Sequence, residues 1–362
     1  MRLKTSTFIL AAILASSCSN ETYLTDSLGV QVTKEENREY SYTDKKAGYW
    51  YGTTHQKDLQ WYSGWNIAKK RIFADYTLSV DGKPLDRNEA ECTVYPDRLV
   101  RKWDNAVETF RMTDNLPIIH IDLETDAKAT SIDIDTTLLS DSYMVDDLKF
   151  FIPTEAQDKR VMLSSDGDKG FVLTYGTEEE CRNLAAEFMA DGDKMHEARK
   201  SRINSLVTEY NPTSSNLPEL DKSLNWITIT MDELITEQQG NGIYAGLPWF
   251  NEYWGRDMFI SMPGACLVTG QFDVAKQILK DFAELQDTDP ESDTYGRIPN
   301  RANLEGILYN TTDGTPRFVI QALELAEYSG DTEFLHDIYP AIKISIDASI
   351  RNYTDNKGYL TH

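Results

Sequence analysis

The sequence predicts a multidomain β + α protein, in which an antiparallel β-sandwich precedes helices arranged as an α/α toroid. Two observations support this fold class. Between about residues 36 and 182, apolar side chains alternate with polar ones, as in strands with one buried face. After Pro212, apolar side chains recur every three or four residues, as in amphipathic helices. This change of period separates a β domain from a helical domain.

The composition is that of a long, acidic, globular chain. Its 362 residues include 36 Lys and Arg against 59 Asp and Glu, which gives a net charge of −23. An apolar share of 40% is enough for packed cores and excludes disorder of the whole chain. Because the excess charge is negative, the phosphates of nucleic acids are repelled, and no nucleic-acid partner is expected.

The N-terminus has the pattern of an export signal. Arg2 and Lys4 precede an apolar stretch over 8–14, and small residues follow it before a cleavage site. The apolar stretch is too short to span a bilayer as a mature helix. Residues 1–17 are therefore expected to be a signal peptide that is removed on export.

Cys18 follows this signal directly. The segment 14–18 resembles a bacterial lipoprotein signal, which implies that Cys18 becomes the lipidated N-terminus. Residues 18–35 are rich in Ser, Thr and Glu and are then interpreted as the lipid anchor and a tether. The protein is accordingly expected to be exported as a lipoprotein, periplasmic or at the cell surface, with the anchor as its only membrane contact. The alternative is ordinary cleavage, with Cys18 playing no part.

The β domain is predicted over 36–182. Alternating apolar residues mark its strands most clearly in two stretches, one of which ends at an Asp-Gly hairpin turn: Tyr76, Leu78 and Val80, and then Ile119, Ile121 and Leu123. Several such strands with turns between them are typical of an antiparallel sandwich. A polar helical stretch over 183–212 is interpreted as a linker helix.

Four amphipathic helices are predicted after this linker. Their apolar residues cover 217–234, 272–285, 318–326 and 334–350. Pro340 is expected to kink the last of them. Long loops that contain glycines and aromatic residues join these helices. In an α/α toroid, the loops at one end form the site.

Neither disulfides nor metals are expected to stabilise this fold. After removal of the signal and apart from Cys18, the cysteines are Cys92, Cys181 and Cys266, which are far apart and odd in number. The histidines lack the spacing of zinc ligands. Acidic residues alternate over 287–293 as at the start of a calcium loop, but the glycine and glutamate that such a loop needs are missing. This segment is interpreted as a solvated acidic loop, and no metal or cofactor is expected.

The segment 244–257 is the densest in aromatic and charged residues. It holds two Trp, two Tyr and one Phe beside a Glu, an Arg and an Asp. Sugars present apolar faces and hydroxyl rims, and therefore suit aromatic rings beside planar hydrogen-bonding groups. Arg256 and Asp257 can together grip neighbouring hydroxyls. The alternative is a structural Arg–Asp pair at a helix start, where an Asp also favours the helix dipole.

Two further loops follow. In 296–301, Pro299 holds the chain extended and is expected to present Asn300 and Arg301 as donors. The segment 309–313 comes just before a predicted helix start at Thr315. Considered alone, each of these loops is more typical of an ordinary turn than of a binding loop.

Taken together and in order, the three segments resemble the glucosidase domain of glycogen-debranching enzymes, the amylo-α-1,6-glucosidase family of (α/α)₆ toroids. The shared elements are AG-x-PWF and WGRD within 244–257, IPNR at 298–301, and YNT-x-D at 309–313. The resemblance covers 213–362, and the β domain looks like the sandwich that precedes the toroid in bacterial and archaeal members. It implies a six-hairpin glycoside hydrolase that acts on α-glucan by inverting hydrolysis.

The resemblance also implies a set of substrate-binding residues. Arg256 and Asp257 are expected to grip the non-reducing glucose. The full set comprises Trp249, Phe250, Trp254, Arg256, Asp257, Asn300, Arg301, Tyr309, Asn310 and Asp313.

The length of the helical part implies that the toroid is incomplete in this sequence. A helix with its loop takes about 30 residues, so twelve helices need about 350, and about five are expected here, including one broken near Pro263. Inverting hydrolysis needs a general acid and a general base. By resemblance both follow His362, and Asp257 and Asp313 are the only nearby substitutes. Apolar helix faces are expected to be left uncovered.

Two other functions remain open. The protein can be a glucan-binding lipoprotein that holds its ligand through Trp249 and Trp254 without hydrolysis. It can also be another toroid hydrolase, trehalase-like or mannosidase-like. In each case the negative charge of the chain favours a neutral sugar over an anionic one.

Overall fold

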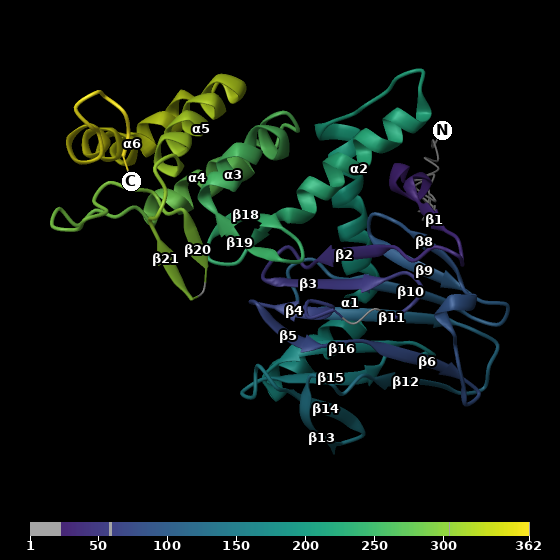
Figure 1. Ribbon diagram of the computed structural model, residues 1–362. Coiled ribbons are helices and arrows are strands. Elements are labelled where there is room, and N and C mark those ends of the chain that lie inside the picture. Colours follow the sequence, from purple (N-terminus) through teal and green to yellow (C-terminus); the bar gives the residue numbers. More distant parts are fainter. Residues whose placement is uncertain (1–22, 58–59, 304, 362) are drawn as a thin grey trace, which may run out of the picture.

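The computed structural model describes residues 23–57, 60–303 and 305–361. The predicted signal peptide and Cys18 lie outside this part of the chain. Figure 1 shows strands in the N-terminal half and helices mainly in the C-terminal half, so the predicted β + α class is confirmed.

The described residues of the β domain form three antiparallel sheets. In spatial order, the largest contains β1 (Val30–Val32), β8 (Glu91–Val94), β9 (Arg98–Lys102), β10 (Val107–Met112), β11 (Ile118–Glu124), β16 (Phe171–Gly176), β15 (Arg160–Ser165), β14 (Leu148–Pro153) and β13 (Leu139–Val145). The second contains β2 (Glu39–Thr43), β3 (Gly48–Thr53), β4 (Gly64–Ile67) and β5 (Lys70–Phe73). The third contains β12 (Thr130–Ile134), β6 (Tyr76–Val80) and β7 (Lys83–Pro84).

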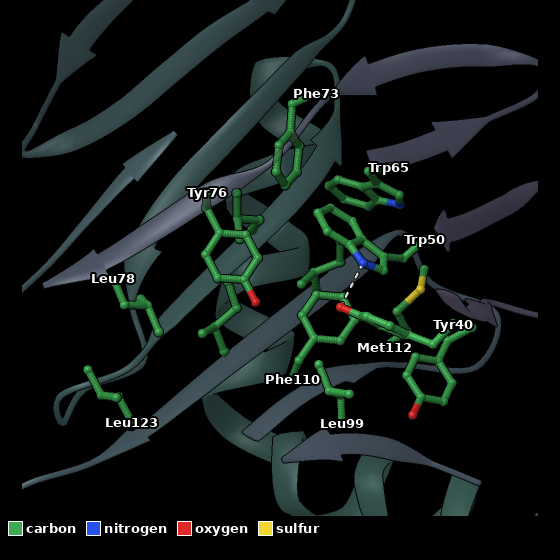
Figure 2. Packing of buried hydrophobic residues seen from close by; sticks show 14 of the residues in the cluster. Tyr40, Trp50, Trp65, Phe73, Tyr76, Leu78, Leu99, Phe110, Met112 and Leu123 are labelled. Atoms are coloured by element: carbon green, nitrogen blue, oxygen red, sulfur yellow. Dashed lines mark hydrogen bonds between the residues drawn. The ribbon is translucent and has the colours of Figure 1, made fainter. Parts of the chain in front are cut away.

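Aromatic side chains from all three sheets form the core of this domain (Figure 2). Trp50 of β3 lies 5.1 Å from Phe110 of β10, measured between ring centroids, and Tyr76 of β6 stacks on the same Phe110. The Trp50 indole N–H donates to the Tyr40 hydroxyl at 3.0 Å, which satisfies the one polar atom that this ring buries. The alternation seen in the sequence therefore corresponds to side chains that meet between facing sheets.

The N-terminal tether differs from its prediction. Leu24–Leu28 form a 3₁₀ helix, and β1 pairs with β8. Leu28 and Val32 are buried, and the Trp226 indole donates to the Leu28 carbonyl at 2.8 Å. The interpretation of 18–35 as a tether is therefore wrong for this described stretch, because its few apolar side chains are enough to dock it.

The linker helix is longer and more deeply packed than predicted. Helix α1 (Glu178–Ser205) begins five residues before 183, where the Thr177 hydroxyl and the Glu180 carboxylate form a capping box. Its side chains Cys181 and Phe188 contact apolar residues of β14, β15, β11 and β16. A π-helix (Leu206–Tyr210) extends it. The helix therefore covers one face of the large sheet, besides connecting the two halves (Figure 1).

The four predicted helices of the C-terminal half are present. They are α2 (Pro218–Leu234), α4 (Phe272–Glu284), α5 (Gly314–Ser329) and α6 (Thr332–Asn352), and α3 (Gly255–Met262) with a π-helix (Pro263–Leu267) forms the broken helix. The rings of Phe282 and Phe318 each lie 5.7 Å from that of Phe259, at the centre of the helical core. In the part of the chain that is described, no helix is long and apolar enough to cross a bilayer.

A small sheet accompanies these helices where the sequence predicts only loops. It contains β17 (Ile235–Glu237), β18 (Asn241–Gly246), β19 (Phe250–Trp254), β20 (Arg301–Asn303) and β21 (Gly306–Leu308). Figure 1 places it at the ends of α3 and α4 that face the β domain. Two of the three motif segments therefore belong to strands.

The cysteines Cys92, Cys181 and Cys266 are buried and free. Burial raises the pKa of the first two thiols to about 11 and that of Cys266 to about 12. These thiols therefore stay protonated at neutral pH and act as small apolar side chains.

Candidate functional site

The first two motifs meet at the start of α3. Strand β19 pairs with β20, which sets Trp254 opposite Arg301. The Gly255 amide donates to the Asn300 carbonyl at 2.6 Å. A Cβ atom at Gly255 would lie 2.4 Å from the Pro299 carbonyl oxygen, so only glycine permits this approach.

The third motif joins them through the buried Asn300. Its side-chain amide donates to the Asn310 side chain at 3.0 Å, and its backbone amide donates to the Leu308 carbonyl at 2.8 Å. Its side-chain oxygen accepts from the Arg256 amide at 3.4 Å. Asn300 was predicted to present a donor to substrate, but the structure uses it to hold the three motifs together.

Arg256 and Asp257 lie in the exposed first turn of α3. The Arg256 guanidinium is half-exposed and lies 4.0 Å from the carboxylate of Asp313, which also accepts from Arg317 at 3.3 Å. Asp313 is the residue just before α5. Two guanidinium groups thus flank the Asp313 carboxylate at the N-terminal ends of α3 and α5, and among the described residues the ion pair of Arg256 is with Asp313.

The aromatic residues of the first motif are divided between two places. Trp254 lies at the start of α3, with the Arg301 guanidinium 5.8 Å from its ring. Trp249 and Phe250 are exposed at the other end of β19. A strand of this length spans roughly 15 Å. The prediction of one aromatic cluster beside the Arg–Asp couple is therefore wrong for Trp249 and Phe250, because the unpredicted strand separates them from it.

The remaining predicted residues are held by neighbouring groups. The Tyr309 hydroxyl donates to the Leu285 carbonyl at 2.7 Å, and its own carbonyl accepts from Arg297 at 2.9 Å. Arg301 pairs with Glu252. Tyr309 therefore connects the third motif to the end of α4, and Arg301 connects the second motif to β19.

Glu252 is a site residue that sequence reasoning missed. Burial raises the pKa of its carboxyl, but hydrogen bonds from Arg301, Lys69 and Asn303 outweigh this effect and lower the pKa to about 2. Because Lys69 belongs to the β domain, the carboxylate also ties the two domains together. In the sequence, Glu252 lies between aromatic residues and the WGRD motif, and this position does not indicate that its carboxylate joins the two domains. Arg317, one helical turn after Asp313, could have been found from that spacing.

The acidic loop and the other described residues hold no group of three or more His, Cys, Asp or Glu side chains placed for a metal ion. In the acidic loop, the Asp287 carboxylate accepts from the hydroxyls of Ser292 and Thr294 at 2.5 Å each. A cavity of about 10 Å³ behind the third motif, lined in part by Arg297 and Tyr353, has room for about one water molecule.

These features define a β + α protein with a solvent-facing cluster of guanidinium and carboxylate groups at the ends of two core helices. Residues 213–359 match the family model described as amylo-alpha-1,6-glucosidase, which confirms the family resemblance for the helical part of the chain. All three motifs lie inside the matched residues. No curated protein matches the chain.

Proposed function

We propose that this protein is a glycoside hydrolase of the glycogen-debranching type, which acts on α-glucan with inversion. The observation that carries the proposal is the ion pair of Arg256 with Asp313, next to the exposed Asp257 in the first turn of α3, inside the segment that matches the family. Charged hydrogen-bonding groups held on helix ends are suited to pairs of sugar hydroxyls.

Each residue has a distinct task in this proposal. Arg256 donates and Asp257 accepts hydrogen bonds from adjacent hydroxyls of the terminal glucose. Asp313, between Arg256 and Arg317, orients the Arg256 guanidinium, and Asn300 fixes the backbone on which it stands. Inverting hydrolysis needs two further carboxyl groups in this proposal, a general acid and a general base that flank the bond that is cleaved.

Uncovered helix faces support the incomplete toroid in this proposal. Exposed apolar side chains recur at helical spacing on three helices: Leu217, Leu220, Leu224 and Ile227 at α2, Ile320 and Leu323 on α5, and Ile346 and Ile350 on α6. Apolar stripes of this kind are expected where further helices pack. The proposal places the remaining helices of the toroid against them.

Asp257→Ala tests the site. We expect the complete gene product to release glucose from a branched limit dextrin, and the variant to lose about 10- to 100-fold in kcat/KM, because one charged hydrogen bond to the sugar is removed. Asp289→Ala, in the acidic loop, is the matched control and should keep full activity. Unchanged activity in Asp257→Ala would argue against the site.

The same assay separates the alternatives. Binding of maltooligosaccharides in a calorimeter without any product would favour a glucan-binding lipoprotein. Release of sugar from trehalose or from a mannoside, but not from limit dextrin, would favour another toroid hydrolase. The family match of residues 213–359 supports the debranching type among these.

We also propose export and anchoring through Cys18, supported by the signal pattern over 1–18. A labelled fatty acid should be incorporated into the wild-type protein during growth and should be absent from Cys18→Ser. Equal labelling of both proteins would contradict lipidation at this residue.

A further inference from the structure

An exposed group of aromatic residues lies where the two domains meet. It consists of Trp61 and Tyr62 from the β domain with Trp249 from the β18–β19 turn and Phe250 at the start of β19, and is called the aromatic platform below. Trp61 is 67% exposed, Trp249 54% and Phe250 57%, whereas Tyr62 is 9% exposed. Two exposed indoles that contact the same buried ring, with a further exposed aromatic side chain next to one of them in the sequence, suggest a binding surface.

The buried Tyr62 holds the two indoles in place. Its ring centroid lies 5.2 Å from that of Trp61 and 5.5 Å from that of Trp249, with interplanar angles of 79° and 78°. Tyr51 of β3 packs against Tyr62 at 5.1 Å. Both indoles therefore contact one fixed ring, and a single short ligand can reach the two together.

Contacts between the domains make the platform rigid. The Tyr49 hydroxyl accepts from the Asn251 side chain at 3.0 Å and donates to the Pro248 carbonyl at 3.4 Å. Leu247 packs against the cluster of Tyr49, Tyr51 and Tyr62. The turn that carries Trp249 is thus fixed to the β domain, so little conformational freedom remains to be lost on binding.

The charges around the platform favour a neutral ligand. On and beside β19, Lys69 and Arg301 each pair with both Glu252 and Glu305, so that two positive and two negative groups balance. The chain as a whole is strongly negative, which repels an anionic ligand. Exposed indole faces without a charged partner suit the apolar faces of neutral sugar rings.

We propose that the aromatic platform is a second sugar site, built by both domains, which holds a neutral glucan chain at a distance from the Arg256 cluster. The choice of a glucan as the ligand rests on the proposed function, but the existence of the binding surface does not. Strand β19 lies between Trp249 and Arg256, so the two sites contact different parts of a chain. Glucan binding and glucose release can therefore be separated by mutation.

Trp61→Ala tests the platform because this side chain is exposed and lies outside the residues that match the family. In calorimetric titration of the complete protein with maltoheptaose, we expect Trp61→Ala and Trp249→Ala each to weaken binding about fivefold or more. Trp61→Tyr, which keeps an aromatic face, should recover most of the affinity. Tyr339→Ala, which removes an exposed aromatic side chain on α6, is the matched control and should bind as the wild type.

The outcomes distinguish this inference from the proposed function. If Trp61→Ala and Trp249→Ala bind maltoheptaose as tightly as Tyr339→Ala does, the platform is overturned, whatever the activity. If they lose binding while the wild type releases no glucose from limit dextrin, the platform stands and the proposed function fails. If Asp257→Ala alone abolishes binding, the chain is held at the Arg256 cluster, and the platform is again overturned.

Discussion

Arg199→Met is expected to lower the free energy of unfolding by about 3–5 kcal/mol, because it removes one partner from a buried set of ion pairs. Arg199 lies on α1 and is 2% exposed. Its guanidinium pairs with Asp114 in the β10–β11 turn and with Glu233 of α2, and donates to the Thr43 carbonyl of β2 at 2.8 Å. One side chain thus joins the β domain to the first helix of the helical half.

The loss of stability arises from the two buried carboxylates that lose the guanidinium as a partner. Burial disfavours the charge of Arg199, but Glu233 and Asp114 outweigh this effect and raise the pKa of its guanidinium. Without it, Glu233 keeps only its contacts to Thr43, and Asp114 keeps Arg202. A methionine of similar length fills the space but cannot compensate these carboxylates.

Urea unfolding followed by tryptophan fluorescence measures this effect, since both halves carry tryptophans. We expect the variant to unfold at a lower urea concentration, because the two halves lose one of the polar connections between them. Arg351→Met, an exposed position on α6, is the control and should stay within about 0.5 kcal/mol of the wild type. A loss below 1 kcal/mol for Arg199→Met would contradict a stabilising role for the network.

The division into a β and an α half was predictable because burial of one face gives apolar residues a spacing of two in strands and of three or four in helices. Tyr76, Leu78 and Val80 are buried as their alternation predicts, and Phe318 and Ala322 face the helical core. Docking of individual segments was less predictable. The start of α1 at Glu178 follows a capping box that is visible in the sequence, whereas the docking of Leu28 depends on distant partners such as Trp226.

The candidate site was predictable in its parts but not in its arrangement. The order of the motifs indicated that they meet, and Asn300 does connect them. The sequence could not show that 250–254 is a strand, because its residues are aromatic or polar on both faces. This strand is why Trp249 contacts Tyr62 of the other domain instead of lying beside Arg256. A contact between residues so distant in the chain leaves no local pattern.

A second large effect is expected on acidification, from His196 at the interface of α1 with the large sheet. The nitrogens His120 Nδ1 and His196 Nε2 lie 3.0 Å apart, and His120 Nε2 lies 3.2 Å from an Asp166 carboxylate oxygen. The other ring nitrogen of His196 is buried without a hydrogen-bond partner among the described residues. Burial, reinforced by Arg111 and His120, lowers the pKa of His196 to about 2.

The direction of the change in stability follows from which state, folded or unfolded, binds a proton at His196. Below about pH 6.5 the unfolded chain protonates this histidine and the folded chain does not, so stability falls as the pH falls. Below pH 6.5, each pH unit lowers the free energy of unfolding by about 1.4 kcal/mol, which adds up to about 3 kcal/mol at pH 4. In His196→Gln the amide cannot titrate, so between pH 7 and pH 4 the variant should lose about 3 kcal/mol less than the wild type. Other titrating groups are common to both proteins and cancel in this comparison.

Urea unfolding at a series of pH values measures the difference, and the exposed His336 provides the control. His336→Gln should follow the wild-type profile, because this exposed position on α6 lies outside the contact of α1 with the large sheet. Parallel profiles for wild type and His196→Gln would mean that the folded protein accepts a proton at His196. The contact of α1 with β11, where the His120 and His196 rings stack, would then tolerate a charge that its burial argues against.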